Sequence, residues 1–523
     1  IYNVNVTVSG GTLSGSVNVD HDLTISGGAV NGSTDVGGDF TMTDGSITGR
    51  VTVNSHTEGK GNFDMSGGKI EGTVSIDGEG ESLRISGDAV IQSTGNDYYD
   101  TIASNNSLDV EISGGTIISP SGYALNFMQG STKIYLSDNP TISGKKADIR
   151  ILQLPAVKDA VLRPHAKDDS SNVYTGGGLT LSALAATEGY LVQGVTDKET
   201  AAKFSLVTPG YELEYEQSTS AIKMRAKTFT VTLPNGAGYT VTPASGSSSP
   251  VKYNGSYSFT VSIADKYYQT DAFEVKAGST VLTPDSSGVY TISNIQADTT
   301  VSVEGVALDN EAPTATITLG KNSWKTFLNT ITFGLFFKDT QTVSITAEDT
   351  GSGIAKIEYF FSDTAYEDEE ALETATGWQD YADAFSIQPN SKLFIYAKVT
   401  DKVGNVTYVN SDGIVLYTDA EQDTAEISFT RKGADDVTAK VKLNGNTVAG
   451  IKCGDDTLTP ETDYTIGSDG TVTFKASWLG TLAAGDYTLT VSYNPLGEEY
   501  QAKDGNAAPD TTSIALKVQK MQG

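Results

Sequence analysis

The first 150 residues repeat one short pattern of apolar and polar positions. Two apolar residues alternate with polar ones, a Ser-Gly-Gly or closely related triplet follows, and another apolar residue comes two positions later. The first copy is Val6-Thr7-Val8-Ser9-Gly10-Gly11-Thr12-Leu13. Further copies lie at 23–30, 40–47, 63–70, 83–90 and 110–117, with a degenerate copy at 134–139. The Ser or Thr that opens each triplet recurs after 17, 17, 23, 20, 27 and 24 residues.

This period predicts stacked strands joined at glycine corners. Alternation with a period of two is typical of β-strands, and glycine adopts the positive φ that a sharp corner needs. Seventeen residues at ~3.3 Å each give about 56 Å, enough for one circuit of a narrow three-sided coil. We therefore expect a right-handed parallel β-helix over 1–150, with apolar residues inside. The alternative is a series of antiparallel hairpins turning at Gly-Gly, which would not explain a constant corner followed by insertions of variable length.

The rest of the chain also has strand patterns, in segments separated by turns. We expect final irregular coils and a cap over 151–227, with a helical turn at 198–203. Alternating runs punctuated by Pro-Asn-Gly and Asn-Gly turns predict a small β domain over 228–306. A β-rich domain over 307–420, with one acidic helix near 366–376, and a final β domain over 421–523 complete the prediction. The chain is thus expected to be all-β, with three small β or β-sandwich domains after the coils.

Several segments resemble modules of known proteins. The Ser-Gly-Gly coils resemble the parallel β-helix regions of large surface proteins from Gram-positive gut bacteria, and 253–259 with 290–295 resembles a small β repeat of those proteins. Segments 330–340 and 401–407 resemble bacterial immunoglobulin-like domains. The last segment resembles X2 modules, on Asp456-Thr457-Leu458, Thr462-Asp463-Tyr464, Trp478-Leu479 and 482–489. The resemblance implies a multidomain surface protein built of scaffolding and adhesion modules, and no catalytic motif comes with it.

The composition argues against several classes of binding partner. With 35 Lys+Arg against 65 Asp+Glu, the net charge is −30. Nucleic acid and anionic membrane surfaces would repel such a chain. The longest apolar run, 331–337, is interrupted by Thr332 and Gly334 and is far too short to span a membrane. The single cysteine, Cys453, excludes an intrachain disulfide. We expect no membrane insertion and a chain that stays monomeric.

No catalytic residue can be assigned from the sequence. The three histidines, His21, His56 and His165, have no metal-ligand or triad spacing. The best candidate for ligand binding is the longest interval between corners, where aromatic faces could pack on a sugar ring and carboxylates could bind its hydroxyls. The residues concerned are Asp97, Tyr98, Tyr99 and Asp100.

Calcium is the one ion that the sequence suggests, and no other cofactor is expected. Asp349, in an Asp-Thr-Gly-Ser-Gly turn, and Asp401 with Asn405, in an Asp-Lys-Val-Gly-Asn turn, offer oxygen ligands. Neither turn has EF-hand spacing, and side chains of this kind also close turns without a metal. The tryptophans Trp324, Trp378 and Trp478 are expected to pack in cores. An acidic neighbourhood should raise the pKa of the Cys453 thiol.

Two functions remain open. The first is a non-enzymatic, extracellular protein of adhesin or stalk type that presents the β-helix surface to glycans or a host surface. We expect it to be secreted or attached to the cell wall through segments absent from this chain, which looks like a fragment of a longer protein. The alternative is an enzyme, a polysaccharide lyase or glycoside hydrolase acting in the coils, with the C-terminal modules as accessories.

Overall fold

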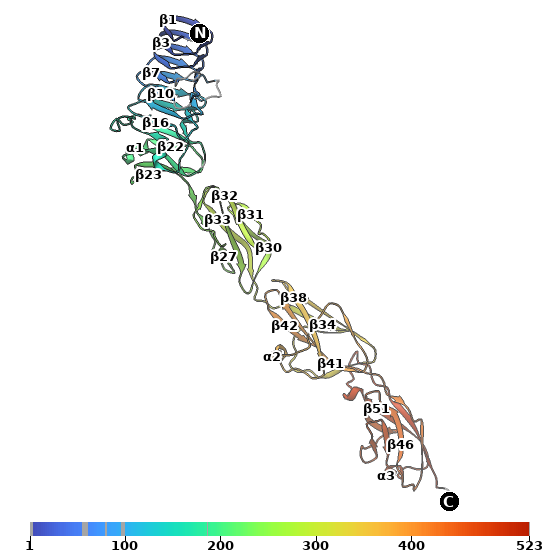
Figure 1. Ribbon diagram of the computed structural model, residues 1–523. Coiled ribbons are helices and arrows are strands. Elements are labelled where there is room, and N and C mark those ends of the chain that lie inside the picture. Colours follow the sequence, from blue (N-terminus) through green and yellow to red (C-terminus); the bar gives the residue numbers. More distant parts are fainter. Residues whose placement is uncertain (1–3, 55–60, 79–80, 96–99, 186, 522–523) are drawn as a thin grey trace. The chain divides into compact units, whose positions relative to one another are not determined.

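The computed structural model describes residues 4–54, 61–78, 81–95, 100–185 and 187–521, and β-strands make up most of its regular structure (Figure 1). The expectation of an all-β protein is confirmed. The α-helices among the described residues are short: α1 (Lys198–Ala202), α2 (Glu369–Glu373) and α3 (Ala476–Leu479). None of the described helices is long and apolar enough to cross a membrane. Contacts divide the chain into two compact units, one of Ile1–Pro234, Thr242–Thr260 and Lys276–Ser302, the other of Asn235–Val241, Val261–Val275 and Val303–Gly523.

Three ladders of parallel strands run through the first unit. The first ladder joins β1 (Val6–Ser14), β3 (Leu23–Asn31), β5 (Phe40–Thr48), β7 (Phe63–Met65), β10 (Glu81–Ile85), β13 (Leu108–Ile112), β16 (Lys133–Leu136) and β19 (Leu162–Arg163). The second continues from the later halves of β1, β3 and β5 through β8 (Lys69–Glu71), β11 (Val90–Gln92), β14 (Thr116–Ser119) and β17 (Thr141–Gly144). The third joins β2 (Val17–Val19), β4 (Thr34–Val36), β6 (Val51–Val53), β9 (Val74–Ile76), β12 (Ile102–Ser104), β15 (Tyr123–Phe127), β18 (Ala147–Ile151), β20 (Leu179–Ala183) and β22 (Phe204–Leu206).

The register of these ladders stacks equivalent positions of the sequence repeat. Leu23 pairs with Phe40, and Val30 pairs with Ile47, in parallel. All four side chains are fully buried, and the ring of Phe40 stacks on that of Phe63 with centroids 4.9 Å apart. Burial of this kind contributes roughly 1.5–3 kcal/mol for each large apolar side chain. The parallel pairing shows that the alternative of antiparallel hairpins turning at Gly-Gly is wrong for these strands.

The Ser-Gly-Gly corners need glycine for two reasons, as Gly28 illustrates. Its φ is +81°, in the left-handed region where residues with a Cβ are strained. A Cβ at this position would also lie 2.7 Å from the backbone carbonyl carbon of Gly10 in the paired strand β1. The second glycine of the pattern therefore serves both the turn and the close approach of stacked backbones.

The parallel order gives way to antiparallel pairing near the end of the first 230 residues. Strand β21 (Gly189–Gln193) pairs in antiparallel fashion with β24 (Ala221–Ala226), which forms a hairpin with β23 (Tyr211–Glu216). Helix α1 lies where a helical turn was predicted, and the carboxylate of Asp197 caps it by accepting a hydrogen bond from the Thr200 backbone N–H at 2.8 Å.

Short strands between 228 and 308 form three small sheets. Their strand orders are β25-β28, β26-β33-β30-β31 and β27-β29-β32. The strands are β25 (Thr228–Phe229), β26 (Val231–Thr232), β27 (Tyr239–Pro243), β28 (Val251–Lys252), β29 (Gly255–Ile263), β30 (Tyr267–Ala277), β31 (Thr280–Leu282), β32 (Val289–Ile295) and β33 (Thr299–Leu308).

Two sheets enclose an apolar core within residues 314–416 of the second unit. One sheet has the order β35 (Asn322–Trp324), β34 (Thr314–Leu319), β37 (Gln341–Glu348), β40 (Phe385–Ile387). The other has the order β36 (Phe333–Phe337), β43 (Gly413–Leu416), β41 (Ser391–Asp401), β38 (Ile354–Ser362), β39 (Gln379–Asp380), with β42 (Val406–Asn410) also paired to β41. Ile317 and Val343 from the first sheet and Ile395 and Val399 from the second share the core. The predicted acidic helix is shorter than expected and begins after Asp368, whose carboxylate accepts from the Ala371 N–H.

Residues 421–519 repeat this two-sheet plan. One sheet has the order β44 (Glu421–Gln422), β46 (Val437–Lys442), β50 (Thr471–Phe474), β49 (Tyr464–Ile466), and the other β45 (Glu426–Thr430), β52 (Thr512–Gln519), β51 (Gly485–Asn494), β47 (Thr447–Cys453), β48 (Asp456–Thr457). Val441 and Phe474 from the first sheet pack with Ile451 and Leu516 from the second. This core leaves the ends of β47 and β51 and helix α3 free to shape a surface site.

Candidate functional site

The four residues predicted to bind a ligand in the coils are only partly described. Asp97, Tyr98 and Tyr99 lie outside the described residues, and Asp100 is half-buried. Both carboxylate oxygens of Asp100 are used by strand β15, because Oδ1 accepts from the Tyr123 N–H at 2.9 Å and Oδ2 accepts from Asn126 Nδ2 at 2.5 Å. Asp100, which precedes β12, therefore helps to join β12 to β15.

A hollow of 440 Å³ lies on the coils beside Arg50. Its lining consists of Thr48, Gly49, Arg50, Glu71, Gly72, Thr73 and Thr94. Glu71 supplies the one carboxylate among these residues, whereas glycoside hydrolysis ordinarily uses two. The described lining also contains no aromatic ring, so it lacks the usual platform for a sugar.

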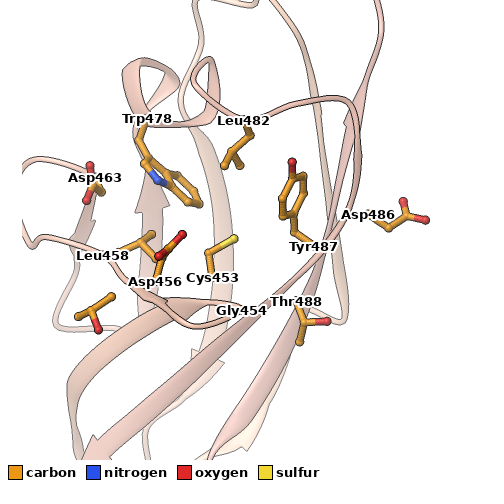
Figure 2. A pocket seen from close by; sticks show the side chains of 11 residues that line it. Cys453, Gly454, Asp456, Leu458, Asp463, Trp478, Leu482, Asp486, Tyr487 and Thr488 are labelled. Carbon is orange, nitrogen blue, oxygen red and sulfur yellow. The ribbon is translucent and has the colours of Figure 1, made fainter.

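A pocket of 430 Å³ lies in the final domain, and two aromatic side chains stand on its opposite sides (Figure 2). It falls within the 300–1,000 Å³ that is usual for small-molecule sites. Residues from the end of β47, β48, α3 and the start of β51 line it. They are Cys453, Gly454, Asp456, Thr457, Leu458, Asp463, Trp478, Leu482, Asp486, Tyr487 and Thr488.

The two rings are held by their own elements. Trp478 sits on the single turn α3, whose first residue, Ala476, donates its backbone N–H to Asp436 Oδ1 at 2.8 Å. The Trp478 ring packs on Phe474 with centroids 5.9 Å apart. Tyr487 is positioned by its hydroxyl, which donates to the Ala483 carbonyl oxygen at 3.0 Å. Both rings are half-buried, so each keeps surface available to a ligand.

Some polar groups of the pocket are used to hold a turn of the protein, whereas others are available to hydrogen-bond a ligand. Asp463 Oδ2 closes a turn by accepting from the Thr459 N–H at 2.7 Å. The exposed carboxylates of Asp456 and Asp486 accept no hydrogen bond from any residue that the structure describes. Figure 2 shows the Cys453 sulfur between the two rings and the Asp456 carboxylate below the Trp478 ring, whereas the Asp486 carboxylate points away from both rings. Asp456 is thus the best-placed acceptor for a ligand hydroxyl.

The Cys453 thiol at the base of this pocket has a raised pKa, as the sequence predicted. The main cause is burial, which disfavours the thiolate, and the charge of Asp456 adds to it. The predicted cause, an acidic neighbourhood, is therefore the smaller of the two. The thiol stays protonated at neutral pH and is a poor nucleophile.

The tryptophans differ from one another in their surroundings. Trp324 is 8% exposed, lies in a core and donates Nε1–H to Asp412 Oδ2 at 3.3 Å. Trp378 packs edge-on against Phe360, with centroids 4.6 Å apart. Trp478 touches the core of its domain but also lines the pocket, so its assignment to core packing alone was incomplete. The signal was in the sequence, because the motifs of the X2 resemblance contain most of the lining residues.

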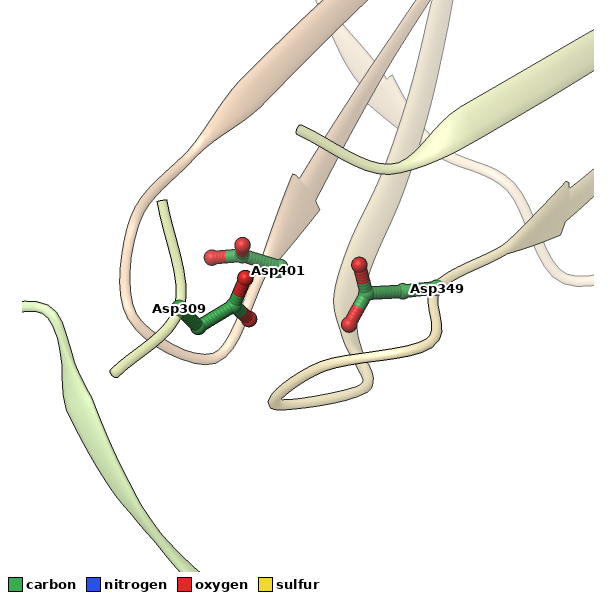
Figure 3. A group of neighbouring side chains, drawn as sticks. All are labelled: Asp309, Asp349 and Asp401. Atoms are coloured by element: carbon green, nitrogen blue, oxygen red, sulfur yellow. The ribbon is translucent and has the colours of Figure 1, made fainter. Parts of the chain in front are cut away.

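The two acidic turns proposed for calcium come together in the second unit, with a third aspartate that sequence reasoning missed. Carboxylate oxygens of Asp309, Asp349 and Asp401 all lie within 4.8 Å of one another. Figure 3 shows these side chains approaching from three separate segments of the chain. Asn405 is differently used, since its Nδ2 donates to Asp401 Oδ2 at 2.7 Å and its Oδ1 accepts from Lys266 Nζ at 2.6 Å. The Ser352 backbone N–H, which donates to Asp309 Oδ2 at 2.6 Å, is the largest cause of the lowered pKa of Asp309.

Comparison with known proteins bears on the region that holds the pocket. Residues 422–501 match the family "Carbohydrate binding domain X2". The expected X2 module is therefore confirmed, and every residue that lines the pocket lies inside the match. A stretch of 98 residues is 39% identical to cellulose-binding protein A of Clostridium cellulovorans. This stretch is 19% of the present chain and 5% of the relative.

Structural neighbours resemble the chain weakly. A tri-modular endo-β-1,4-glucanase from Bacillus licheniformis gives a TM-score of 0.20 at 15% identity, over 39% of this chain and 38% of that one. The I67–I69 fragment of titin gives 0.24 at 8% identity, over 57% of this chain and 98% of that one.

Proposed function

We propose that this chain is an extracellular carbohydrate-binding protein whose C-terminal pocket holds a sugar ring between Trp478 and Tyr487. The observation that carries the proposal is the pair of half-exposed rings on opposite sides of a pocket within the X2 match. Aromatic faces pack on the C–H surfaces of pyranose rings, and carboxylates accept hydrogen bonds from sugar hydroxyls.

The charge of the pocket favours neutral sugars. Asp456, Asp463 and Asp486 line it, and its lining includes no Lys or Arg. An acidic sugar would meet like charges at close range, which disfavours binding. A neutral β-glucan is the natural first ligand to test, because the relative from Clostridium cellulovorans is named as a cellulose-binding protein.

The rest of the chain supports a role as a scaffold that carries this module. We infer that 1–150 is a right-handed parallel β-helix with irregular coils and a cap to 227, and the three parallel ladders support this inference. The segments 228–306 and 307–420, the latter a bacterial immunoglobulin-like domain, would then lie between the coils and the X2 module in the sequence. We propose a monomeric, non-enzymatic protein of adhesin or stalk type, secreted or held at a cell surface, whose coil face could meet further glycans or a host surface.

The proposal is tested with the full chain on insoluble cellulose and, by calorimetry, on soluble neutral β-glucan oligosaccharides. We expect Trp478→Ala to weaken binding by about tenfold or more, since removing a stacking platform typically costs more than 1 kcal/mol. Tyr487→Ala should act in the same direction. Phe361→Ala is the matched control, because Phe361 is an exposed ring (41%) outside the pocket.

The outcomes separate the alternatives. If Trp478→Ala and Tyr487→Ala both bind the glucan as well as wild type does, the pocket is not the binding site. The coils would then be the next candidate. Release of sugars from a polysaccharide panel by the wild-type chain would favour the enzymatic alternative over the adhesin.

A further inference from the structure

We propose that Asp309, Asp349 and Asp401 form a binding site for a divalent cation, Ca²⁺, in the second unit. The site lies far along the sequence from the sugar pocket, and it is independent of the function proposed for that pocket. Each aspartate comes from a different segment: Asp309 follows β33, Asp349 follows β37, and Asp401 ends β41. A cation held by all three would tie these segments together.

The geometry suits one ion. Ligand atoms of the three residues all lie within 4.8 Å of one another, and their carboxylates are turned toward a common region (Figure 3). Oxygens bound to one Ca²⁺ ion at 2.3–2.6 Å stand no more than about 5.2 Å apart, so the three aspartates can share a single ion. The coordination of Ca²⁺ is more flexible than that of Mg²⁺, which favours Ca²⁺ at a site built from separate turns.

Burial makes this concentration of charge costly without a cation. Asp309 is 3% exposed and Asp401 is 2% exposed, while Asp349 is half-buried. None of the three forms an ion pair with Lys or Arg within 4.0 Å among the described residues. Lys266 lies nearby but donates its hydrogen bond to Asn405. Three carboxylates so close together repel one another, and a divalent cation would offset this repulsion.

A second, independent observation points to a ligand at this place. Ser352 is 6% exposed, and its hydroxyl oxygen is buried without a hydrogen bond of normal geometry. The backbone N–H of Ser352 donates to Asp309 Oδ2 at 2.6 Å, which places this serine beside the three carboxylates. A buried hydroxyl without a partner costs about 1–3 kcal/mol. The cation would give this oxygen a partner, so Ser352 completes the site as a fourth oxygen ligand.

The turns hold the carboxylates in place in advance of binding. Asp349 Oδ2 accepts from the backbone N–H groups of Gly351 at 3.1 Å and Gly353 at 2.6 Å. Asp401 Oδ1 accepts from those of Val403 at 2.9 Å and Asn405 at 2.8 Å. These bonds orient the aspartates and still leave lone pairs on each carboxylate for a metal. An Asn in place of Asp keeps an acceptor for the turn and removes the charge, which makes Asp→Asn the informative substitution.

The test is calorimetric titration of the EDTA-treated full chain with CaCl₂, paired with thermal unfolding in Ca²⁺ and in EDTA. We expect wild type to bind Ca²⁺ and to unfold at a higher temperature in its presence. Asp349→Asn should weaken binding at this site by about tenfold or more, since affinity follows the number of charged ligands. The Tm of this variant should respond little to EDTA. MgCl₂ at the same concentration should bind more weakly than CaCl₂.

Two further variants keep the outcome independent of folding defects. Ser352→Ala should weaken Ca²⁺ binding several-fold while leaving the Ca²⁺-free protein as stable or more stable, a combination that a purely structural serine would not give. Asp285→Asn is the matched control, because Asp285 Oδ1 closes a similar turn by accepting from the N–H groups of Ser287 and Val289. The proposal is overturned if folded wild type binds no Ca²⁺, or if Asp285→Asn and Asp349→Asn reduce binding equally.

Discussion

The hydroxyl of Tyr417 donates a hydrogen bond to the backbone carbonyl oxygen of Ala507 at 2.9 Å. Tyr417 follows β43 and is fully buried, and Ala507 precedes β52, so the bond joins 307–420 to the final domain of the chain. The adjacent Asn506 accepts from the Phe336 N–H at 3.1 Å. Burial raises the pKa of Tyr417, which keeps its hydroxyl protonated and able to donate. The second unit is thus held together by specific polar contacts as well as by its apolar cores.

Removing that donor should destabilise the second unit. We expect Tyr417→Phe to lower its free energy of unfolding by about 1 kcal/mol, since the Ala507 carbonyl loses its partner. Tyr500→Phe is the control, because the Tyr500 ring contacts Phe336 with centroids 5.3 Å apart and no described residue hydrogen-bonds its hydroxyl. Urea unfolding followed by tryptophan fluorescence measures both variants. Equal losses of unfolding free energy in the two variants would show that the hydrogen bond of the Tyr417 hydroxyl does not stabilise the unit.

The thiol of Cys453 offers a probe of the pocket, because it is the one cysteine in the chain. Its pKa is raised from the ordinary value of 9.0, so at pH 8 it holds less thiolate than a free cysteine. Alkylation by iodoacetamide should be slow at pH 8, and its rate should still be rising with pH beyond 9.0, the ordinary thiol pKa. Asp456→Asn should raise the rate at pH 8 by a few-fold, because it removes the nearby negative charge.

Ligand protection extends this measurement. A sugar bound between Trp478 and Tyr487 should slow the alkylation of Cys453, and it should do so less in Trp478→Ala. Unchanged labelling at a saturating concentration of a glycan that binds the chain would place that glycan elsewhere.

The glycine corners of the coils can be tested by a matched pair. Gly28→Ala should destabilise the first unit by at least about 1–2 kcal/mol, the usual cost of a Cβ at positive φ, because its φ is +81° and the new atom would meet Gly10. Gly10→Ala should have little effect, since nothing lies within 4 Å of a Cβ there. Hydrogen exchange by mass spectrometry reports on the coils separately from the other domains. Similar rates of hydrogen exchange in Gly28→Ala and Gly10→Ala would contradict the explanation that stacked backbones require glycine at position 28.

Salt should distinguish neutral from acidic ligands. The net charge of −30 and the carboxylates of the pocket predict weak binding to polyuronates at low ionic strength, improving as salt screens the repulsion. Binding to a neutral β-glucan should change little between 20 and about 500 mM NaCl. Tight, salt-weakened binding to a polyuronate would indicate a basic surface other than this pocket.

By itself, the sequence determined the features that are local or strictly periodic. The alternation around Phe40 and Ile47 and the glycine at position 28 specify strands and corners because side chains alternate with a period of two and because only glycine tolerates the corner. The motifs around Asp456 and Trp478 identified the X2 module because they are short and contiguous in the sequence.

Only the tertiary structure decided which distant side chains meet. Asp309 joins Asp349 and Asp401 because sheet pairing and strand length place the ends of β33, β37 and β41 together, which no spacing in the sequence reveals. The pocket likewise depends on how the single turn α3 sets Trp478 opposite Tyr487. Strand patterns specify faces, whereas the convergence of side chains depends on twist, loop length and packing between sheets.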